Sequence, residues 1–369
     1  LEFRRVLFRS VRAGARTYKK GRNLAAADVA ALCDAGVTQV TVVRLEPSDV
    51  PEDVAAARIA EMLHGENLRG AEAFTGRANL YAEKHGIVIV DPTPIDDANL
   101  VDEAITLASL PSFAVVAPGD MVATVKIIPF AAPGHAVTRV TDTLRGKNAL
   151  HVAAFQAHRV ALISTALPTT KDSVLDKTRA AVEARLGPLG GGLISEQRVA
   201  HDAAAIADAI RRSGDADMVF VFGASAITDR HDVIPAGIEL AGGQVSHFGM
   251  PVDPGNLLLL GAWQGKPVVG LPGCARSPKL NGFDFVLQRL AAGVPVGPRD
   301  LMRMGVGGLL KEIPTRGQLR DAHPNAMRAP RIAAVVLAGG LSSRMGSNKL
   351  LASVDGKPLL RRTVEAALK

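Results

Sequence analysis

The sequence predicts an α/β fold in which a mixed, mainly parallel sheet carries helices on both faces, giving a three-layer α/β/α domain. Between residues 158 and 293, short apolar runs alternate with amphipathic helical stretches, which is typical of right-handed βαβ units. The run DMVFVFG at residues 217–223 is almost entirely apolar, as expected of a central parallel strand covered on both sides. Hydrophobic residues make up 47% of the chain and aromatic residues only 4%, so the core must be built from aliphatic side chains.

The elements of this central region can be assigned in order along the chain. RVALIST (residues 159–165) is the first expected strand, and KDSVLDKTRAAVEARLG (residues 171–187) is an amphipathic helix that Gly187 ends. The remaining expected elements are the strand LISEQRV (193–199), the helix DAAAIADAIRRSG (202–214), and the strands NLLLLGAW (256–263) and PVVGLPG (267–273). Ligands of such folds bind at the carboxyl ends of the parallel strands.

The beginning of the chain is less regular. Residues 1–10, LEFRRVLFRS, lack an initiator Met and resemble a translated sequencing adaptor, so they are interpreted as a non-native leader and set aside. Residues 11–150 are expected to form a small α+β region with a structural or dimerising role. Within that region, RANLYAEKHGIVIVD and NLVDEAITLASLP, which together span residues 77–111, are interpreted as helix, strand and helix. MVATVKIIPFAAPG, at residues 121–134, is expected to alternate as a strand and to end in a turn.

One helix of this region is expected just before Gly36. Residues 26–35 carry apolar side chains at helical spacing, with Ala30, Leu32 and Ala35 predicted to face inward. Gly36 is a typical stop signal, and a β-branched strand is expected after it.

Composition excludes several classes of protein. The formal net charge is +7, but part of it comes from the arginines of the leader, and the other cations are scattered. With few aromatic residues to stack on bases, nucleic-acid binding is not expected. No apolar run approaches the roughly 20 residues that span a bilayer, so no membrane partner is expected. Cys33 and Cys274 lie far apart, without Cys or His partners at metal spacing, which favours a reducing, cytoplasmic location.

A candidate ligand site follows the third strand of the central region. The loop GASAITDRHDVIP (residues 223–235) is rich in small residues and leads into a helix, an arrangement in which backbone N–H groups can cradle an anion. Asp229 and Asp232 lie at its end, where they could bind a cation, hydrogen-bond a polar ring or cap the helix. The alternative is an ordinary loop with a capping aspartate.

Three segments of this region resemble, in the same order, the molybdopterin-binding domain of MoaB- and Mog-like molybdenum cofactor biosynthesis proteins, of both the adenylylating and the metal-inserting types. DRHDVIP (229–235) resembles the segment with the family's functional aspartate, which falls on Asp232. VDPGNLLLLG (252–261) and VVGLPGCARS (268–277) resemble its two proline- and glycine-rich segments. The resemblance implies a molybdopterin-binding domain over residues 151–295 and a linker over 296–330. The implied molybdopterin-binding residues are Gly223, Ala224, Ser225, Asp229, Asp232, Pro254, Gly255, Pro272, Gly273 and Arg276.

The chain departs from that family at positions that affect phosphate binding. Ala224 and Ser225 stand where the family has paired glycines, which restricts how closely the backbone can approach a phosphate. Asp253 and Asn256 stand where it has lysines, so two cationic partners are lost and one position reverses its sign. Arg276, whose planar guanidinium suits phosphate oxygens, is expected to compensate. The domain is therefore expected to hold molybdopterin or its molybdenum-loaded form, and whether it catalyses a reaction is left open.

A second motif lies close to the end of the chain. IAAVVLAGG, beginning at Ile332, predicts a buried strand that runs into a glycine turn, and LSSRMGSNKLL follows it. Gly339 and Gly340 allow the backbone to approach a nucleotide closely. Arg344 and Lys349 supply two positive charges for a triphosphate, which nucleotidyl transfer needs because negative charge builds on the leaving pyrophosphate. The alternative is a glycine-rich turn with solvated cations.

Together with the downstream VDGKPLL (residues 354–360), this motif resembles the start of the molybdenum cofactor cytidylyl- and guanylyltransferases, which join CTP or GTP to molybdopterin and release pyrophosphate. A looser similarity extends to sugar-phosphate and isoprenoid cytidylyltransferases. The resemblance implies a truncated Rossmann-like nucleotidyltransferase domain from residue 331, with Arg344 and Lys349 as catalytic residues. The implied nucleotide-binding residues are Leu337, Ala338, Gly339, Gly340, Ser342, Arg344, Gly346 and Lys349. Gly340 favours GTP and SNKLL favours CTP; CTP is preferred overall.

The second resemblance leads to a proposal about the whole protein. A domain of this type needs on the order of 150 residues, so a chain that ends at Lys369 is interpreted as a fragment of a bifunctional protein, inactive in transfer alone. The Mg²⁺ ligands expected for transfer would lie beyond its end. The implied partners are molybdopterin and CTP or GTP, with a second copy of the chain and a molybdoenzyme acceptor as further candidates.

Two alternative functions remain at this stage. A non-catalytic molybdopterin carrier or sensor would account for the substitutions at Ala224, Asp253 and Asn256. An isoprenoid or sugar cytidylyltransferase would leave the central region unexplained.

Overall fold

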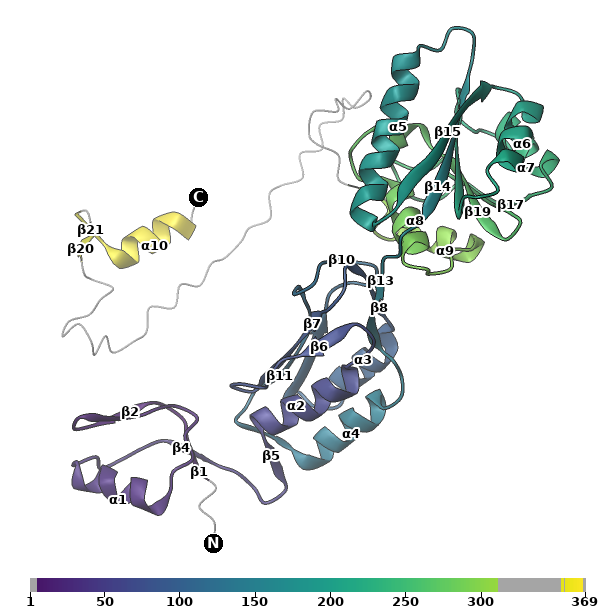
Figure 1. Ribbon diagram of the computed structural model, residues 1–369. Coiled ribbons are helices and arrows are strands. Elements are labelled where there is room, and N and C mark those ends of the chain that lie inside the picture. Colours follow the sequence, from purple (N-terminus) through teal and green to yellow (C-terminus); the bar gives the residue numbers. More distant parts are fainter. Residues whose placement is uncertain (1–4, 311–352, 355, 368–369) are drawn as a thin grey trace, which may run out of the picture. The chain divides into compact units, whose positions relative to one another are not determined.

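The computed structural model describes residues 5–310, 353–354 and 356–367 (Figure 1). The chain divides into two compact units, Leu1–Lys311 and Glu312–Lys369. Among the described residues, no helix has both the length and the apolar character that crossing a membrane requires.

A six-stranded sheet forms the centre of residues 159–291. Its strands are β14 (Arg159–Ala166), β15 (Gly192–Ala200), β16 (Met218–Phe222), β17 (Gln244–Phe248), β18 (Leu259–Trp263) and β19 (Lys266–Leu271). In space the order is β15-β14-β16-β19-β18-β17; the first four strands run parallel, and β18 is antiparallel to both of its neighbours. The predicted α/β fold with a mixed, mainly parallel sheet is confirmed, and β17 is a strand that the sequence analysis did not predict.

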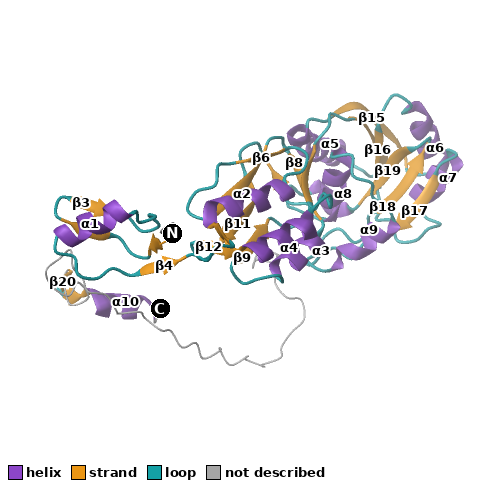
Figure 2. Ribbon diagram, turned by 90° about the horizontal axis from the view of Figure 1, so that it is seen from below, coloured by secondary structure: helices purple, strands orange, loops and turns teal. Residues whose placement is uncertain are grey.

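Helices cover both faces of this sheet, as Figures 1 and 2 show. One face carries α5 (Asp172–Leu186) and α8 (Gly282–Ala291), and the other carries α6 (Ala203–Arg212) and α7 (Val233–Leu240). Because successive side chains of a strand point to opposite faces, Phe220 of β16 joins the first core, and Val219 and Val221 join the second. Phe220 packs edge-to-face against Phe283 of α8, with 5.3 Å between the ring centroids.

The ends of this domain differ from the expected boundaries. Residues 151–154 belong to β13 (Leu150–Ala154), which pairs with β8 (Gly86–Val90) of the preceding region. Residues 298–305, expected in a linker, form α9 (Pro298–Met302) and a 3-10 turn. Leu301 and Met304 of this segment are buried in the core that contains Phe220. Apolar residues three apart lie on one face of a helical turn, so this stretch packs despite its proline and glycine content.

Residues 49–154 form two antiparallel sheets, a short strand pair and three helices. One sheet has the order β6-β7-β11-β9, the second has the order β10-β8-β13, and β5 pairs with β12. The additional elements are β5 (Asp49–Pro51), β6 (Leu68–Gly70), β7 (Arg77–Ala82), β9 (Ile105–Ser109), β10 (Val115–Val116), β11 (Met121–Ile127), β12 (Ala131–Pro133), α2 (Glu52–Leu63), α3 (Pro92–Asn99) and α4 (Gly134–Leu144). The strand expected within residues 121–134 is present as β11.

The prediction of two helices within residues 77–111 is wrong where the structure has the strands β7 and β9. Alternate residues of β7, namely Ala78, Leu80 and Ala82, are buried in the core, which is the pattern of a half-buried strand. The local sequence favours a helix, but pairing of β7 and β9 with the two edges of β11 satisfies their backbone groups instead.

Residues 5–45 form a small unit around α1 (Ala26–Asp34). Its strands are β1 (Arg5–Leu7), β2 (Val11–Ala13), β3 (Arg16–Tyr18) and β4 (Val42–Arg44). Leu32 of α1 is buried as predicted, but Ala30 and Ala35 are exposed. Asp28 takes an inward position instead, where it pairs with Arg22 over 2.9 Å.

The supposed leader takes part in this unit. β1 pairs with β4, and Leu7 is completely buried beside Leu32 and Tyr18. Setting residues 1–10 aside was therefore wrong for Val6 and Leu7, because their apolar side chains are buried in small cores. Their origin outside the native protein stays a prediction.

In the second unit, the structure describes one hairpin and one helix. β20 (Ser353–Val354) pairs with β21 (Lys357–Pro358), and α10 (Leu359–Ala367) follows. Glu365 accepts hydrogen bonds from Lys357 over 2.9 Å and from Arg361 over 3.1 Å, and these bonds lower the pKa of its carboxyl group. The expected nucleotide-binding loop, residues 337–349, lies outside the described residues.

Candidate functional site

The carboxyl ends of the parallel strands meet at one edge of the six-stranded sheet. Ser164 of β14 lies opposite Phe222 of β16, which lies opposite Leu271 of β19, so the loops after these strands start side by side. β18 begins at the same edge, because Leu259 pairs with Gly270. Every residue that the first resemblance implied for molybdopterin binding lies in the segments that follow β16 and β19 or precede β18. The topology therefore brings these segments to the edge where such folds bind ligands.

The loop after β16 starts with a glycine for a steric reason. A Cβ atom on Gly223 would lie 2.4 Å from the carbonyl oxygen of Ser225 and 3.0 Å from the Ile234 side chain of α7. The N–H of Ala224 donates to Thr165 Oγ1 on β14 over 2.8 Å. This donor is satisfied inside the protein, so the predicted anion cradle has one backbone N–H fewer. Ser225 is exposed and accessible to a ligand.

The two aspartates of this loop have different contacts. Asp232 caps α7: its Oδ1 accepts from the N–H of Val233 over 2.7 Å, and its Oδ2 accepts from that of Thr228 over 3.2 Å. Asp229 Oδ1 accepts from the backbone N–H of His231 over 2.7 Å, and the ring Nδ1 of His231 lies at the same distance. These contacts, the backbone one foremost, lower the pKa of Asp229. Among the roles considered for Asp232, the structure shows helix capping.

Arg276 supplies a cation at this edge. It ends the 3-10 turn Gly273–Arg276 after β19, and its guanidinium carbon lies 4.1 Å from the centroid of the Phe222 ring. Its Nε donates to Thr178 Oγ1 of α5 over 3.0 Å. Burial lowers the pKa of this guanidinium, yet arginine stays charged at neutral pH. Within residues 5–310, its two terminal nitrogens make no hydrogen bond to protein, which leaves them available for a ligand oxygen.

Comparison with protein families connects this geometry with a function. Residues 160–292 match the family model of a probable molybdopterin binding domain. Residues 334–369 match that of a MobA-like NTP transferase domain. Both resemblances noted in the sequence are confirmed, and residues 160–292 are called the molybdopterin-type domain from here on.

Several solved structures resemble the chain. A molybdopterin biosynthesis moea protein from Pyrococcus horikosii is 17% identical, with 68% of this chain and 80% of that chain covered and a TM-score of 0.30. A molybdenum cofactor biosynthesis protein B is 18% identical, with 37% and 88% covered and a TM-score of 0.26. A molybdopterin biosynthesis protein from Mycobacterium abscessus is 15% identical, with 37% and 92% covered and a TM-score of 0.23. A comparison with curated proteins found no match.

A buried arginine that the sequence analysis missed organises the Arg276 loop of the molybdopterin-type domain. Arg185 of α5 is 9% exposed and pairs with Asp284 of α8 over 2.7 Å. Its other nitrogens donate to the carbonyl oxygens of Ala181 at 3.1 Å, Ala275 at 3.0 Å, Ser277 at 2.5 Å and Lys279 at 3.2 Å. A signal was present in the sequence, because Arg185 follows Val182 by three residues on the apolar stripe of α5.

The segment before β18 is held against the start of α8. Gly255 has φ +139, and a Cβ atom there would lie 2.5 Å from the backbone nitrogen of Gly282. The N–H of Gly282 donates to the carbonyl oxygen of Pro254 over 2.9 Å. Asp253 exchanges backbone hydrogen bonds with residues 308 and 310, and Asn256 Nδ2 lies 3.5 Å from the carbonyl oxygen of Met250. Pro254 and Gly255 therefore position α8, and their expected contact with molybdopterin stays a prediction.

The turn after β19 begins with two more of the implied residues. Pro272 is buried, whereas Gly273 is exposed and has open space where a side chain would be. This leaves room for a ligand next to the backbone of the turn that carries Arg276.

His201 is a second residue that the sequence analysis missed. It follows β15, and its two ring nitrogens lie 2.8 Å from Thr165 Oγ1 and 2.8 Å from Ser225 Oγ. Sequence spacing contained no signal for this contact, because the three residues belong to separate βα units.

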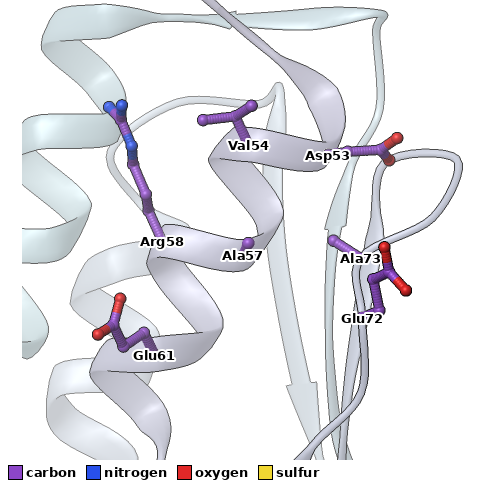
Figure 3. A pocket seen from close by; sticks show the side chains of 7 residues that line it. All are labelled: Asp53, Val54, Ala57, Arg58, Glu61, Glu72 and Ala73. Carbon is purple, nitrogen blue, oxygen red and sulfur yellow. The ribbon is translucent and has the colours of Figure 1, made fainter.

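A hollow of about 390 Å³ lies on α2, away from this edge. In Figure 3, Asp53 and Glu72 lie on one side of the helix and Arg58 and Glu61 on the other, so their charges do not converge. Asp53 already accepts from the N–H of Gly76 over 2.6 Å. Among the described residues, no group of three or more His, Cys, Asp or Glu side chains is arranged to hold a metal ion.

Proposed function

We propose that this chain acts in molybdenum cofactor biosynthesis and that its molybdopterin-type domain binds molybdopterin at the carboxyl edge of the sheet. The family match supports the ligand, and the anchored guanidinium of Arg276, which lies against Phe222 at the end of β16, supports the place. A phosphate needs a cation of fixed position with free N–H donors, which Arg276 offers.

In the proposed site, different residues contact the phosphate and the pterin ring of the ligand. Arg276 and the exposed hydroxyl of Ser225 would contact the phosphate, while the carboxylates of Asp229 and Asp232 would accept N–H groups of the pterin ring. The remaining implied residues would shape the backbone around the ligand; they are Gly223, Ala224, Pro254, Gly255, Pro272 and Gly273.

Molybdopterin binding by the full chain under anaerobic conditions tests this proposal. Arg276→Ala is expected to weaken binding by roughly 10- to 100-fold, the effect of losing one or two hydrogen bonds from a charged group. Arg179→Ala is the matched control, because Arg179 is 53% exposed on α5 and pairs only with carboxylates. Absence of binding by the unmodified chain, or equal affinity of both variants, would contradict the proposal.

The two cysteines offer an independent test of the place. Cys274 lies in the turn that carries Arg276, where burial is the main cause that raises the pKa of its thiol, and Cys33 is exposed on α1. Bound molybdopterin is expected to slow alkylation of Cys274 and to leave Cys33 unaffected. Unchanged alkylation of Cys274 in the saturated protein would place the ligand elsewhere.

We further propose that, in the complete protein, the MobA-like segment belongs to a nucleotidyltransferase that joins CMP, in preference to GMP, to molybdopterin and releases pyrophosphate. The match of residues 334–369 supports this proposal. Leu337, Ala338, Gly339, Gly340, Ser342 and Gly346 would contact the nucleotide, and Arg344 and Lys349 would hold its phosphates. Mg²⁺ would neutralise charge on the leaving pyrophosphate.

A transfer assay distinguishes the two nucleotides. A protein with the complete nucleotidyltransferase domain, given molybdopterin, Mg²⁺ and labelled CTP or GTP, is expected to release pyrophosphate, faster with CTP. Arg344→Ala and Lys349→Ala are each expected to reduce turnover at least 100-fold, the scale of losing one transition-state contact, with molybdopterin binding intact. No transfer from either nucleotide would leave the carrier function.

The alternative function is a non-catalytic carrier or sensor of molybdopterin. Asp253 and Asn256 favour it, because neither supplies a cation to the site and the backbone of Asp253 is bonded to residues 308 and 310. If the chain is a carrier, it binds molybdopterin, but no nucleotide is transferred and no pyrophosphate is released.

The proposed partners and compartment follow from the same chemistry. Molybdopterin and CTP or GTP are the small-molecule partners, and a second copy of the chain and a molybdoenzyme acceptor are the macromolecular ones. Both cysteines are free thiols, which agrees with the proposed reducing cytoplasm.

A further inference from the structure

Three side chains form a hydrogen-bonded chain at the edge of the sheet. Thr165 Oγ1 on β14 lies 2.8 Å from His201 Nδ1, and His201 Nε2 lies 2.8 Å from Ser225 Oγ. Thr165 is 1% exposed, whereas Ser225 is exposed. The chain therefore leads from a buried hydroxyl group to one that a ligand can reach.

The positions of the other hydrogen bonds determine where the protons lie. Thr165 Oγ1 accepts the N–H of Ala224 over 2.8 Å, so its own proton must go elsewhere. Two acceptors are within reach: His201 Nδ1 at 2.8 Å and the carbonyl oxygen of Phe222 at 3.4 Å. The shorter contact is within the normal range for an O–H donor and the longer one is outside it. Nδ1 is thus the acceptor, and neutral His201 carries its proton on Nε2.

This arrangement fixes the direction of the Ser225 hydroxyl. The Nε2–H of His201 donates to Ser225 Oγ, so the serine proton points away from the imidazole and is free to be donated. In a serine nucleophile the direction is reversed, since the imidazole must accept the serine proton. A hydroxyl donor of fixed direction, in the loop that follows Phe222 and its contact with Arg276, suits an oxyanion. The Ser225 hydroxyl also takes the place of the Ala224 N–H as a donor to the ligand, because that N–H already donates to Thr165 Oγ1.

We propose that His201 and Thr165 are positioning residues that hold the Ser225 hydroxyl as an outward donor to a phosphate oxygen of the bound pterin. This inference rests on the proposed function, because it requires a phosphate-bearing ligand at this edge. It adds two residues, from β14 and from the turn after β15, to the site.

The proton position can be measured without a ligand. ¹⁵N NMR of the full chain with labelled histidine, in alkaline buffer, distinguishes a proton on Nδ1 from a proton on Nε2 of a neutral imidazole. His201→Gln identifies the signals of His201 by their loss. We expect the proton on Nε2, and a proton on Nδ1 would overturn the proposal, since Nε2 would then accept from Ser225.

Molybdopterin binding tests whether the oriented Ser225 hydroxyl contributes to ligand affinity. Ser225→Ala and His201→Leu are each expected to weaken binding roughly tenfold, the effect of one hydrogen bond to a charged group. His201→Gln is expected to remain within about twofold of the wild type, because its amide nitrogen can take the place of Nε2 as a donor. His247→Gln on β17 is the matched control.

The double variant separates positioning from a general structural role. If His201 acts through Ser225, His201→Leu has no further effect once Ser225→Ala is present. An additive loss, or a His201→Gln variant as weak as His201→Leu, would overturn the proposal. If the unmodified chain binds no molybdopterin, the proposed function fails, and the NMR result alone decides whether Ser225 is held as an outward donor.

Discussion

At the edge of the six-stranded sheet where the ligand is proposed to bind, the loops are held by different interactions on the two faces of the sheet. On the face of α5 and α8, the interactions are those of two arginines: Arg185 is buried with Asp284 and four carbonyl oxygens, and Arg276 lies against Phe222. On the face of α6 and α7, the supporting contacts are the hydrogen bonds of Thr165, His201 and Ser225 and the cap at Asp232. A buried charge costs several kcal/mol if its partner is lost, whereas a neutral hydrogen bond costs about one. The first face is therefore expected to be the more sensitive to substitution.

The largest expected effect is that of Arg185→Ala. It should lower the free energy of unfolding by about 3 kcal/mol, because Asp284 would remain 14% exposed without its counter-charge. Urea unfolding can be followed by the fluorescence of Trp263, the single tryptophan, which is 5% exposed in β18 and reports on this domain alone.

The matched control lies on the same helix. Arg179 is 53% exposed and pairs with Glu183 over 3.0 Å, so Arg179→Ala should change the free energy of unfolding by about 0.5 kcal/mol at most. Equal effects of the two substitutions would show that burial of Arg185 does not matter for stability.

The second effect concerns close packing on the other face. A Cβ atom on Gly237 of α7 would lie 2.7 Å from the Ile206 side chain and 3.1 Å from the carbonyl oxygen of Ala203, both on α6. Gly237→Ala should therefore lower the free energy of unfolding by about 2 kcal/mol. Gly214→Ala, where the nearest atom is 3.9 Å away, is the control. An unchanged urea midpoint for Gly237→Ala would mean that α6 and α7 have room to separate.

The third effect separates the cap from the ligand contact. Asp232→Ala removes the cap of α7 and should lower the free energy of unfolding by about 1 kcal/mol, whereas Asp232→Asn should keep the cap. If the carboxylate also accepts from the pterin ring, both variants should weaken molybdopterin binding in calorimetry. Wild-type affinity in Asp232→Asn would leave Asp232 with a capping role alone.

The smallest expected effect is the pH dependence of the stability that Asp229 contributes. The folded-state pKa of Asp229 is lowered by His231, so its stabilising contribution is present above the unfolded pKa of about 4 and is lost as the pH falls through the folded pKa. The Tm difference between wild type and Asp229→Asn should shrink on acidification below about pH 4. It should be small throughout, because Asp229 is 67% exposed. A difference that grows in acid would contradict the lowered pKa.

Much of the fold could be predicted because its signals are local. The apolar run of β16 and the stripe of α5 are complete within one segment, and both elements form where expected. β7 and β9 could not be predicted, since their sequences favour helix and only pairing with β11 makes them strands. The buried strand β1 was also missed, because its unusual composition gave no indication that Leu7 would complete a core.

The residues of the candidate site also divide into those that local sequence reveals and those that only tertiary contacts reveal. Asp232 and Arg276 could be found from motifs, and Gly223 from the strand-to-loop pattern. Arg185 was detectable only as a cation on an apolar stripe. Thr165 and His201 gave no signal, because the hydrogen bonds that link them to Ser225 join three separate βα units.

The sequence by itself determined the α/β class of this protein, its two family segments and the order of the loops that meet at the sheet edge. These properties are carried by side-chain periodicity and by short motifs, which do not depend on distant partners. Only the tertiary structure decided which cation is free at that edge, which one is neutralised by Asp284, and which way the Ser225 hydroxyl points. The reason is that a hydrogen bond or an ion pair belongs to two groups at once, and folding alone brings both within 3 Å of each other.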